Sequence, residues 1–250
     1  MTGLPAVLWL VRHGESAGNV ARADAEASGA TLIAIEGRDV DVPLSALGER
    51  QARALGTWFS QQPNREQPTV VLSSPYARAL QTSKLVLESA GLESAVPLLI
   101  DERLREKEFG SLNRFTRAGI MSVFPEEAQR RTEIGKFYYR PPGGESWCDV
   151  LLRLRSVLDQ LQLRYAGQRV LVVSHQVVVI CFRYLLENLD EQRLLSIDGQ
   201  GDVANCALTT YQAVNDGGRE TLALSQYNWL TPLEEAGAPV TATPDPAAKK

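Results

Sequence analysis

The chain contains only two histidines, His13 and His175, and each stands directly after a short apolar run. A neutral imidazole nitrogen can attack phosphorus, and a planar guanidinium such as that of Arg12 can hold phosphate oxygens with a fork of donors. Arg12, His13 and Gly14 could therefore support phosphoryl transfer through a histidine, although these three residues alone are a weak signal. The second histidine, in an equivalent sequence position, is expected to assist at the same site.

The apolar runs at 6–11 and 168–174 are predicted to be buried strands, because they are short and continuous and contain many β-branched residues. A helix is expected after each, over 16–28 and over 177–189. In open α/β sheets, ligands bind at the carboxyl ends of the strands. Both histidines are therefore expected at that end of the sheet.

The rest of the chain alternates further strands with helices, and the last two strands flank the turn sequence N-D-G-G, which is typical of a hairpin. This order predicts an α/β fold with a mixed sheet. We expect strands over 69–72, 96–100, 206–214 and 221–227, helices beginning after Ser45 and Ser146, and Pro75 in the first turn of the helix that contains Arg78.

Length and composition favour one domain over 1–230, with 44% apolar residues to build its core. The composition of 231–250 shifts to Pro, Ala, Glu and Thr and predicts a disordered tail. A formal net charge of −4 does not favour nucleic acid as a partner. No apolar run approaches the length of a membrane span and no signal peptide is indicated, so a cytoplasmic location is expected.

Metal binding is not expected, because the histidines lie far apart in the sequence and no carboxylates cluster near them at ligand spacing. The three cysteines are odd in number and widely spaced, which is unlike a disulfide framework or a zinc site.

Three segments resemble the histidine phosphatase superfamily, also called the phosphoglycerate mutase-like superfamily. They are R-H-G-E-S followed by Asn19, S-S-P-Y-A-R-A-L-Q-T with Arg78, and R-L-R-E with Glu106. The similarity extends over roughly 8–227. It implies a three-layer α/β/α sandwich with a mainly parallel central sheet, to which the hairpin adds an antiparallel C-terminal strand pair. It also implies phosphoryl transfer through a phosphohistidine, without metal or other cofactor.

The resemblance and the chemistry together assign a role to each matching residue. His13 fits the nucleophile, and Arg12, Arg78 and His175 fit a cationic clamp around the phosphate oxygens. Glu106 fits the acid that protonates the leaving oxygen, with Glu102 and Glu108 as nearby rivals.

Four further residues are candidates for substrate binding. Ser16 and Asn19 either contact phosphate or serve only as helix caps and turn residues. Arg140 in Y-R-P-P-G-G-E-S and Gln176 after the second histidine resemble the bisphosphatase domain of the bifunctional fructose-2,6-bisphosphate enzymes. Gly143 stands where those domains often have a basic residue, and this departure weakens the similarity.

The leading function is a phosphatase that acts on a small phosphorylated metabolite. The alternatives are a phosphoglycerate mutase, a bisphosphatase-type sugar phosphatase and, in another class, a non-catalytic phosphate-binding module. The segments 29–42 and 115–140 are expected to shape the substrate pocket, the second as a helical lid. The sequence fixes neither the substrate nor the oligomeric state.

Overall fold

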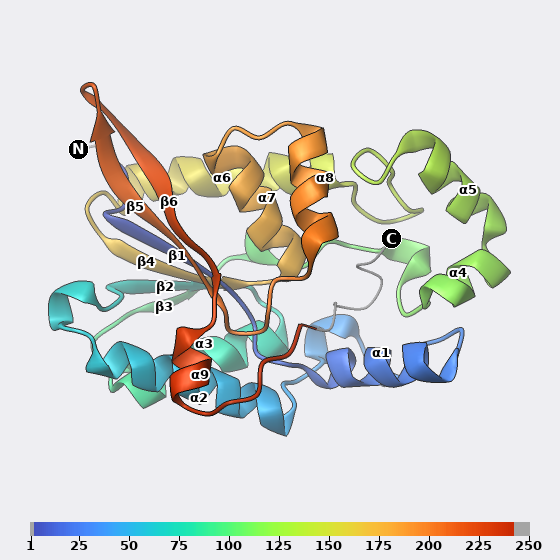
Figure 1. Ribbon diagram of the computed structural model, residues 1–250, viewed down its shortest axis with the longest axis horizontal. Helices are drawn as coiled ribbons and strands as arrows, with labels where there is room; N and C mark the ends of the chain where they lie inside the picture. Colours follow the sequence, from blue (N-terminus) through green and yellow to red (C-terminus); the bar gives the residue numbers. More distant parts are fainter. Residues whose placement is uncertain (1–2, 243–250) are drawn as a thin grey trace.

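The computed structural model describes residues 3–242, and its strands form one six-stranded sheet in the order β3-β2-β4-β1-β5-β6 (Figure 1). The first four in this order are parallel, whereas β5 pairs antiparallel with β1, and β6 pairs antiparallel with β5. The expected mixed sheet with an antiparallel C-terminal pair is thus confirmed. The strands are β1 (Val7–Arg12), β2 (Val70–Ser73), β3 (Leu98–Ile100), β4 (Arg169–Ser174), β5 (Leu208–Asp216) and β6 (Arg219–Trp229).

Strands β1 and β4 are direct neighbours at the centre of the sheet, and their register pairs Arg12 with Ser174. His13 and His175 are the next residue of each strand. Parallel pairing therefore places the two imidazoles side by side, with ring centroids 5.1 Å apart. The prediction that both histidines lie at the same end of the sheet is confirmed.

Helices cover both faces of the sheet, because alternate residues of the central strands point to opposite sides. Leu8 and Leu10 of β1 belong to one apolar cluster, whereas Trp9 and Val11 belong to the other. Figure 1 shows α6, α7 and α8 over the first face and α2, α3 and α9 over the second. These helices are α2 (Ala46–Gln61), α3 (Ala77–Ala90), α6 (Trp147–Arg164), α7 (Gln176–Leu186), α8 (Glu191–Gln200) and α9 (Thr231–Glu235).

Serine side chains fix the starts of three helices. Ser45 and Ser146 accept hydrogen bonds from backbone N–H groups in the first turns of α2 and α6, as expected. Ser16 does the same for α1 (Ala17–Ser28). Pro75 differs from expectation: α3 begins at Ala77 after an extended Tyr76, so the proline lies before the helix.

Two helices were not expected from the sequence. Helix α8 carries only two buried apolar side chains, Leu194 and Ile197, so its periodicity is weak. Helix α9 lies in the segment predicted to be disordered, and this prediction is wrong for 231–242, because Leu233 is fully buried in the cluster beneath the sheet. The remainder of the predicted tail, 243–250, lies outside the described residues.

The two segments expected to shape the pocket contact each other beyond the end toward which β1 runs (Figure 1). Residues 29–42 contain one short 3₁₀ helix, Asp39–Asp41, and residues 115–140 contain α4 (Arg117–Val123) and α5 (Pro125–Ile134). A backbone hydrogen bond from Thr116 to the Thr31 carbonyl joins them, and a second runs from Ile33 to the carbonyl of Arg114, just before the second segment. Within 3–242, no helix combines the length and apolar character that crossing a bilayer requires.

Candidate functional site

His13 is buried at the end of β1 with its ring orientation fixed from both sides. Its Nδ1 donates to the Gly14 carbonyl oxygen at 2.6 Å, and its Nε2 accepts from Arg78 Nε at 3.2 Å. A carbonyl can only accept and a guanidinium can only donate, so the ring is the neutral tautomer with its proton on Nδ1. Nε2 is therefore the unprotonated nitrogen, as an attack on phosphorus requires, and Arg78 lies beside it.

The His175 ring packs against the His13 ring and is held by residues that directly follow β2. Its Nε2 is 2.8 Å from the Ser74 hydroxyl, and the Tyr76 ring meets its ring edge to face at 5.0 Å. His175 is also the N-cap of α7. The first turn of a helix carries partial positive charge, so an anion placed here is stabilised.

Two buried arginines, Arg12 and Arg78, lie next to His13, the first in sequence and the second through a hydrogen bond. Arg12 ends β1, and its Nη1 donates to the Val203 carbonyl at 2.8 Å. Arg78 comes from the first turn of α3, and its Nη1 donates to the backbone and side-chain oxygens of Asp39 at 2.8 and 3.1 Å. The structure thus brings together both predicted arginines and both histidines.

Glu106 differs from its two rivals by burial. Its side chain is 1% exposed, and its Oε1 accepts a hydrogen bond from the Lys107 backbone N–H at 2.7 Å. Glu102 and Glu108 are exposed, although Glu108 accepts a hydrogen bond from the Tyr76 hydroxyl. The burial favours Glu106 as the acid, and this role stays a prediction.

Ser16 and Asn19 form a reciprocal capping box. The Ser16 hydroxyl accepts from the Asn19 backbone N–H, and Asn19 Oδ1 accepts from the Ser16 backbone N–H at 2.9 Å. This geometry supplies the capping role that the sequence left open. Contact with phosphate remains a prediction for both residues.

The two residues predicted from the bisphosphatase resemblance differ in their burial. Gln176 follows His175 and is buried, with its Nε2 donating to Asp202 Oδ1 at 2.6 Å. Arg140 is a surface residue, with its side chain 62% exposed and paired with Asp149 of α6. The buried cluster of histidines and arginines therefore does not include Arg140.

Sequence reasoning missed the residues that hold the cluster from other loops. Ser74 and Tyr76 lie within the S-S-P-Y-A-R motif, but the sequence does not show what they contact. The other three come from segments without a motif, so no sequence signal marks them. The group comprises Asp39, Ser74, Tyr76, Val203 and Asn205.

A chain of hydrogen bonds connects the C-terminal segment to the backbone on both sides of Gly14. Asn205 Nδ2 donates to the His13 carbonyl at 2.8 Å, and its Oδ1 accepts from the Thr241 hydroxyl. Gln51 Nε2 donates to that same hydroxyl oxygen, and Gln51 Oε1 accepts from the Glu15 backbone N–H. The turn after β1 is thus held by the far end of the described chain.

The same turn packs directly against the start of α2 through two glycines. A Cβ atom at Gly48 would lie 1.9 Å from the Glu15 carbonyl oxygen, and one at Gly14 would lie 2.5 Å from the Gly48 oxygen. Both contacts are with backbone, which cannot move aside cheaply. Gly14 and Gly48 are therefore required by close approach of two backbones.

We expect Gly48→Ala to lower the free energy of unfolding by at least about 2 kcal/mol, because the added methyl group overlaps the Glu15 backbone. Chemical denaturation measures the change. Gly199→Ala is the control, since nothing lies within 4 Å of its Cβ position in α8, and it should be neutral or stabilising by up to about 1 kcal/mol. Equal stability of the two variants would contradict the close approach.

Comparison with known proteins shows the family to which the chain belongs. A family model described as histidine phosphatase superfamily (branch 1) matches residues 8–225. The chain is 33% identical over 207 residues to a protein of Yersinia enterocolitica named probable phosphoglycerate mutase GpmB, covering 81% of this chain and 82% of that protein.

Solved structures share the fold at lower identity. A mycobacterial glucosyl-3-phosphoglycerate phosphatase complexed with VO3 is 24% identical with a TM-score of 0.67, covering 90% of this chain and 100% of that one. The α-ribazole phosphatase of Shigella flexneri is 23% identical with a TM-score of 0.68, covering 89% and 97%. The expected α/β/α architecture is confirmed, and the chain belongs to branch 1 of the histidine phosphatase superfamily.

Proposed function

We propose that the protein is a metal-independent phosphatase that hydrolyses a small phosphomonoester through a phosphohistidine on His13. The observation that carries the proposal is the His13 ring, whose Nδ1 donates to the Gly14 carbonyl while Nε2 faces Arg78. The imidazole is therefore already in the tautomer that attacks. A cytoplasmic location and a single domain remain predictions from the sequence.

In the first half-reaction, His13 Nε2 bonds to phosphorus while the bond from phosphorus to the ester oxygen breaks. Arg12, Arg78 and His175 stabilise the charge on the equatorial oxygens, where most of the catalysis of phosphoryl transfer arises. Glu106 gives its proton to the departing oxygen. In the second, the Glu106 carboxylate takes a proton from water, whose oxygen bonds to phosphorus as the bond to Nε2 breaks, and phosphate leaves.

A mutase is the second candidate, and the 33% identity to a protein named phosphoglycerate mutase favours it. A mutase would return the phosphoryl group to a bound acceptor, whereas a phosphatase gives it to water. Incubation with 3-phosphoglycerate, with and without 2,3-bisphosphoglycerate, separates the two. Release of inorganic phosphate from a panel of phosphomonoesters without 2-phosphoglycerate supports the phosphatase, and bisphosphate-dependent interconversion overturns it.

The bisphosphatase-type sugar phosphatase and the non-catalytic module are weaker candidates. The first depended in part on Arg140, which is largely exposed and paired with Asp149. The second is disfavoured because all five proposed catalytic residues are present and buried. Turnover of p-nitrophenyl phosphate would exclude a purely binding module.

We expect turnover to be unchanged by EDTA, because arginine and histidine side chains provide the positive charge around phosphate. Vanadate should inhibit competitively by occupying the same cations. Initial rates with and without the chelator, after dialysis, test the first expectation. Loss of activity that a divalent cation restores would contradict the proposed mechanism.

A further inference from the structure

The carboxylate of Asp39 binds Arg78, one of the residues proposed to hold the phosphate. Asp39 begins the short 3₁₀ helix Asp39–Asp41, and its side chain is 21% exposed, whereas that of Arg78 is 1% exposed. Its Oδ1 accepts from Nη1 of Arg78 at 3.1 Å, and its Oδ2 accepts from Nη2 at 3.4 Å. The Asp39 backbone carbonyl also accepts from Nη1, at 2.8 Å. Asp39 thus contacts both terminal nitrogens of the arginine.

The contacts of Arg78 give the two edges of its planar guanidinium different partners. Nη1 and Nη2 form the end of the fork, and this end faces the Asp39 carboxylate. Nε and Nη2 form the lateral edge, and on this edge Nε donates to His13 Nε2 at 3.2 Å. When Nε2 bonds to phosphorus, this N–H loses its acceptor, and a phosphate oxygen can replace it. Asp39 therefore holds Arg78 by the edge that does not face the reacting phosphate.

The surroundings fix both partners of this contact. The Val42 backbone N–H donates to the Asp39 carbonyl at 3.2 Å and closes the 3₁₀ turn, and Val42 is buried. The Arg78 guanidinium lies over the Tyr76 ring, with Cζ 4.9 Å from the ring centroid. A long arginine side chain loses much rotamer freedom when it is fixed, so a partner that fixes it before substrate binds removes that cost from the reaction.

The loop that carries Asp39 is held in turn by the side chain of Arg114. Nη1 of Arg114 donates to the Ile35 carbonyl at 3.0 Å, and its Nη2 donates to the Gly37 carbonyl. These carbonyls lie four and two residues before Asp39. The guanidinium of Arg114 therefore fixes the path of the chain that leads to Asp39.

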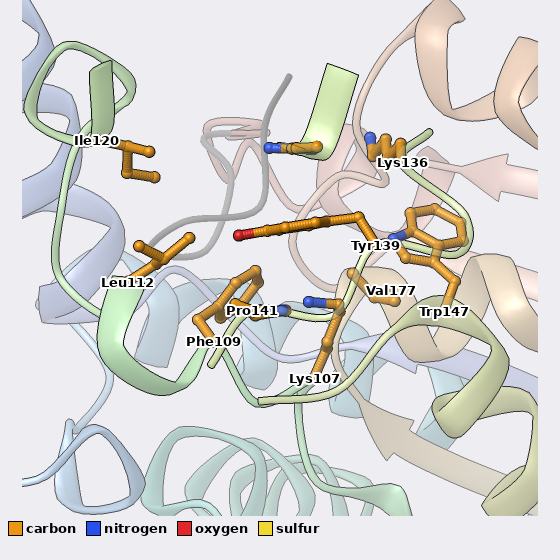
Figure 2. Close-up of a pocket in the computed structure, with 10 residues that line it drawn as sticks. Lys107, Phe109, Leu112, Ile120, Lys136, Tyr139, Pro141, Trp147 and Val177 are labelled. Carbon is orange, nitrogen blue, oxygen red and sulfur yellow. The ribbon is translucent and has the colours of Figure 1, made fainter. Parts of the chain in front are cut away.

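Arg114 also adjoins the wall of a cavity. Leu112 and Ile120, which lie on either side of it in the sequence, line the same cavity as Lys107, the residue after the proposed acid. Figure 2 shows Leu112 and Ile120 together on one side of this cavity. Arg114 thus connects the wall of the cavity to the loop that carries Asp39.

We propose that Asp39 is a positioning residue, whose carboxylate holds the guanidinium of Arg78 so that Nε faces the phosphate at His13, and that Arg114 acts through Asp39. The proposal rests on the proposed function, because it assigns to Arg78 the binding of phosphate oxygens. Asp39 itself does not contact the phosphate. Its removal therefore lowers kcat/KM through Arg78 alone.

The test is a double-mutant cycle between Asp39 and Arg78, measured as kcat/KM for p-nitrophenyl phosphate. We expect Asp39→Asn, which keeps the backbone contact but loses the carboxylate, to lower kcat/KM by roughly 10–10²-fold, as misplacement of a group at the reacting centre does. Asp39→Ala should lower it at least as far. Arg78→Ala should lower it further, and adding Asp39→Asn to Arg78→Ala should cause little additional loss, because no guanidinium is left to hold.

Asp41→Asn is the matched control, since Asp41 lies in the same 3₁₀ helix but pairs with the exposed Arg38. It removes the same charge as Asp39→Asn and should keep the wild-type kcat/KM. Arg114→Met should lower kcat/KM by a smaller factor than Asp39→Asn and add little to it when the two are combined. Unfolding by denaturant measures the folded fraction of each variant, and rates are compared per folded protein.

Loss of the same factor on Asp39→Asn in the wild type and in Arg78→Ala would overturn the proposal, because a purely structural role does not depend on Arg78. Unchanged or raised kcat/KM in both Asp39 variants would also overturn it, since the carboxylate would then be neutral or compete with phosphate. Either result leaves the phosphatase intact. Failure of the wild type to hydrolyse any phosphomonoester overturns the proposed function and the positioning role together.

Discussion

His13→Ala is expected to abolish turnover, with a loss on the order of 10⁶-fold, the scale found when an enzyme's covalent nucleophile is removed. The wild type should accumulate a phosphoenzyme that is stable in alkali and labile in acid, as a phosphoramidate is. Rapid quenching in alkali with ³²P-labelled substrate should trap it. Cleavage after Arg12 and Arg22 should place the label on the peptide 13–22, in which His13 is the only histidine.

His175→Ala is the matched control, because it removes the neighbouring imidazole, whose ring centroid lies 5.1 Å from that of His13. His175 also follows a central parallel strand, as His13 does. We expect it to lower the rate by roughly 10²–10³-fold through weaker stabilisation of charge, while His13 still becomes labelled. Unfolding by denaturant should show that both variants are folded. Label on His175 would exchange the two roles, and substantial activity of His13→Ala would exclude the phosphohistidine mechanism.

Glu106→Gln should slow the hydrolysis of esters with poor leaving groups by roughly 10²–10⁴-fold, because an alkoxide must be protonated as it departs. It should affect p-nitrophenyl phosphate far less, since nitrophenolate is stable without a proton. The ratio of kcat/KM between an alkyl phosphate and p-nitrophenyl phosphate, measured for wild type and variant, gives the effect directly.

Glu102→Gln and Glu108→Gln are the controls, because both side chains are exposed. We expect their ratios between the two substrates to match that of the wild type. Equal loss on both substrates in Glu106→Gln would indicate a structural role for its buried carboxyl group. A loss of activity on the alkyl phosphate alone in Glu108→Gln would instead assign the acid role to Glu108, which accepts a hydrogen bond from Tyr76.

The central strands and the positions of both histidines could be predicted from the sequence, because the patterns that indicate them are local. An apolar run predicts a strand, and a parallel neighbour places the next residue of each at the same edge. Pairing of Arg12 with Ser174 provides that juxtaposition in the structure. The position of Arg78 could be predicted in the same way, because it lies in the first turn of the helix that follows β2.

The parts that sequence reasoning missed depend on contacts between distant segments. Leu233 gives α9 its buried position, although the composition around it resembles that of a disordered tail. Arg140 was predicted from a local motif, but Asp149, which also completes the cap of α6, binds its guanidinium at the surface.

The support of the turn after β1 by residues near the C-terminus has a consequence for biosynthesis. The backbone carbonyl of His13 is held by Asn205, which is synthesised 192 positions later, and Asn205 is held in turn by Thr241. At 5–20 residues per second, the interval between synthesis of His13 and Asn205 is roughly 10–40 s. Throughout that time, the nascent chain carries the proposed nucleophile without the hydrogen bond from Asn205, and the network that holds the turn after β1 is complete only once Thr241 has also been synthesised.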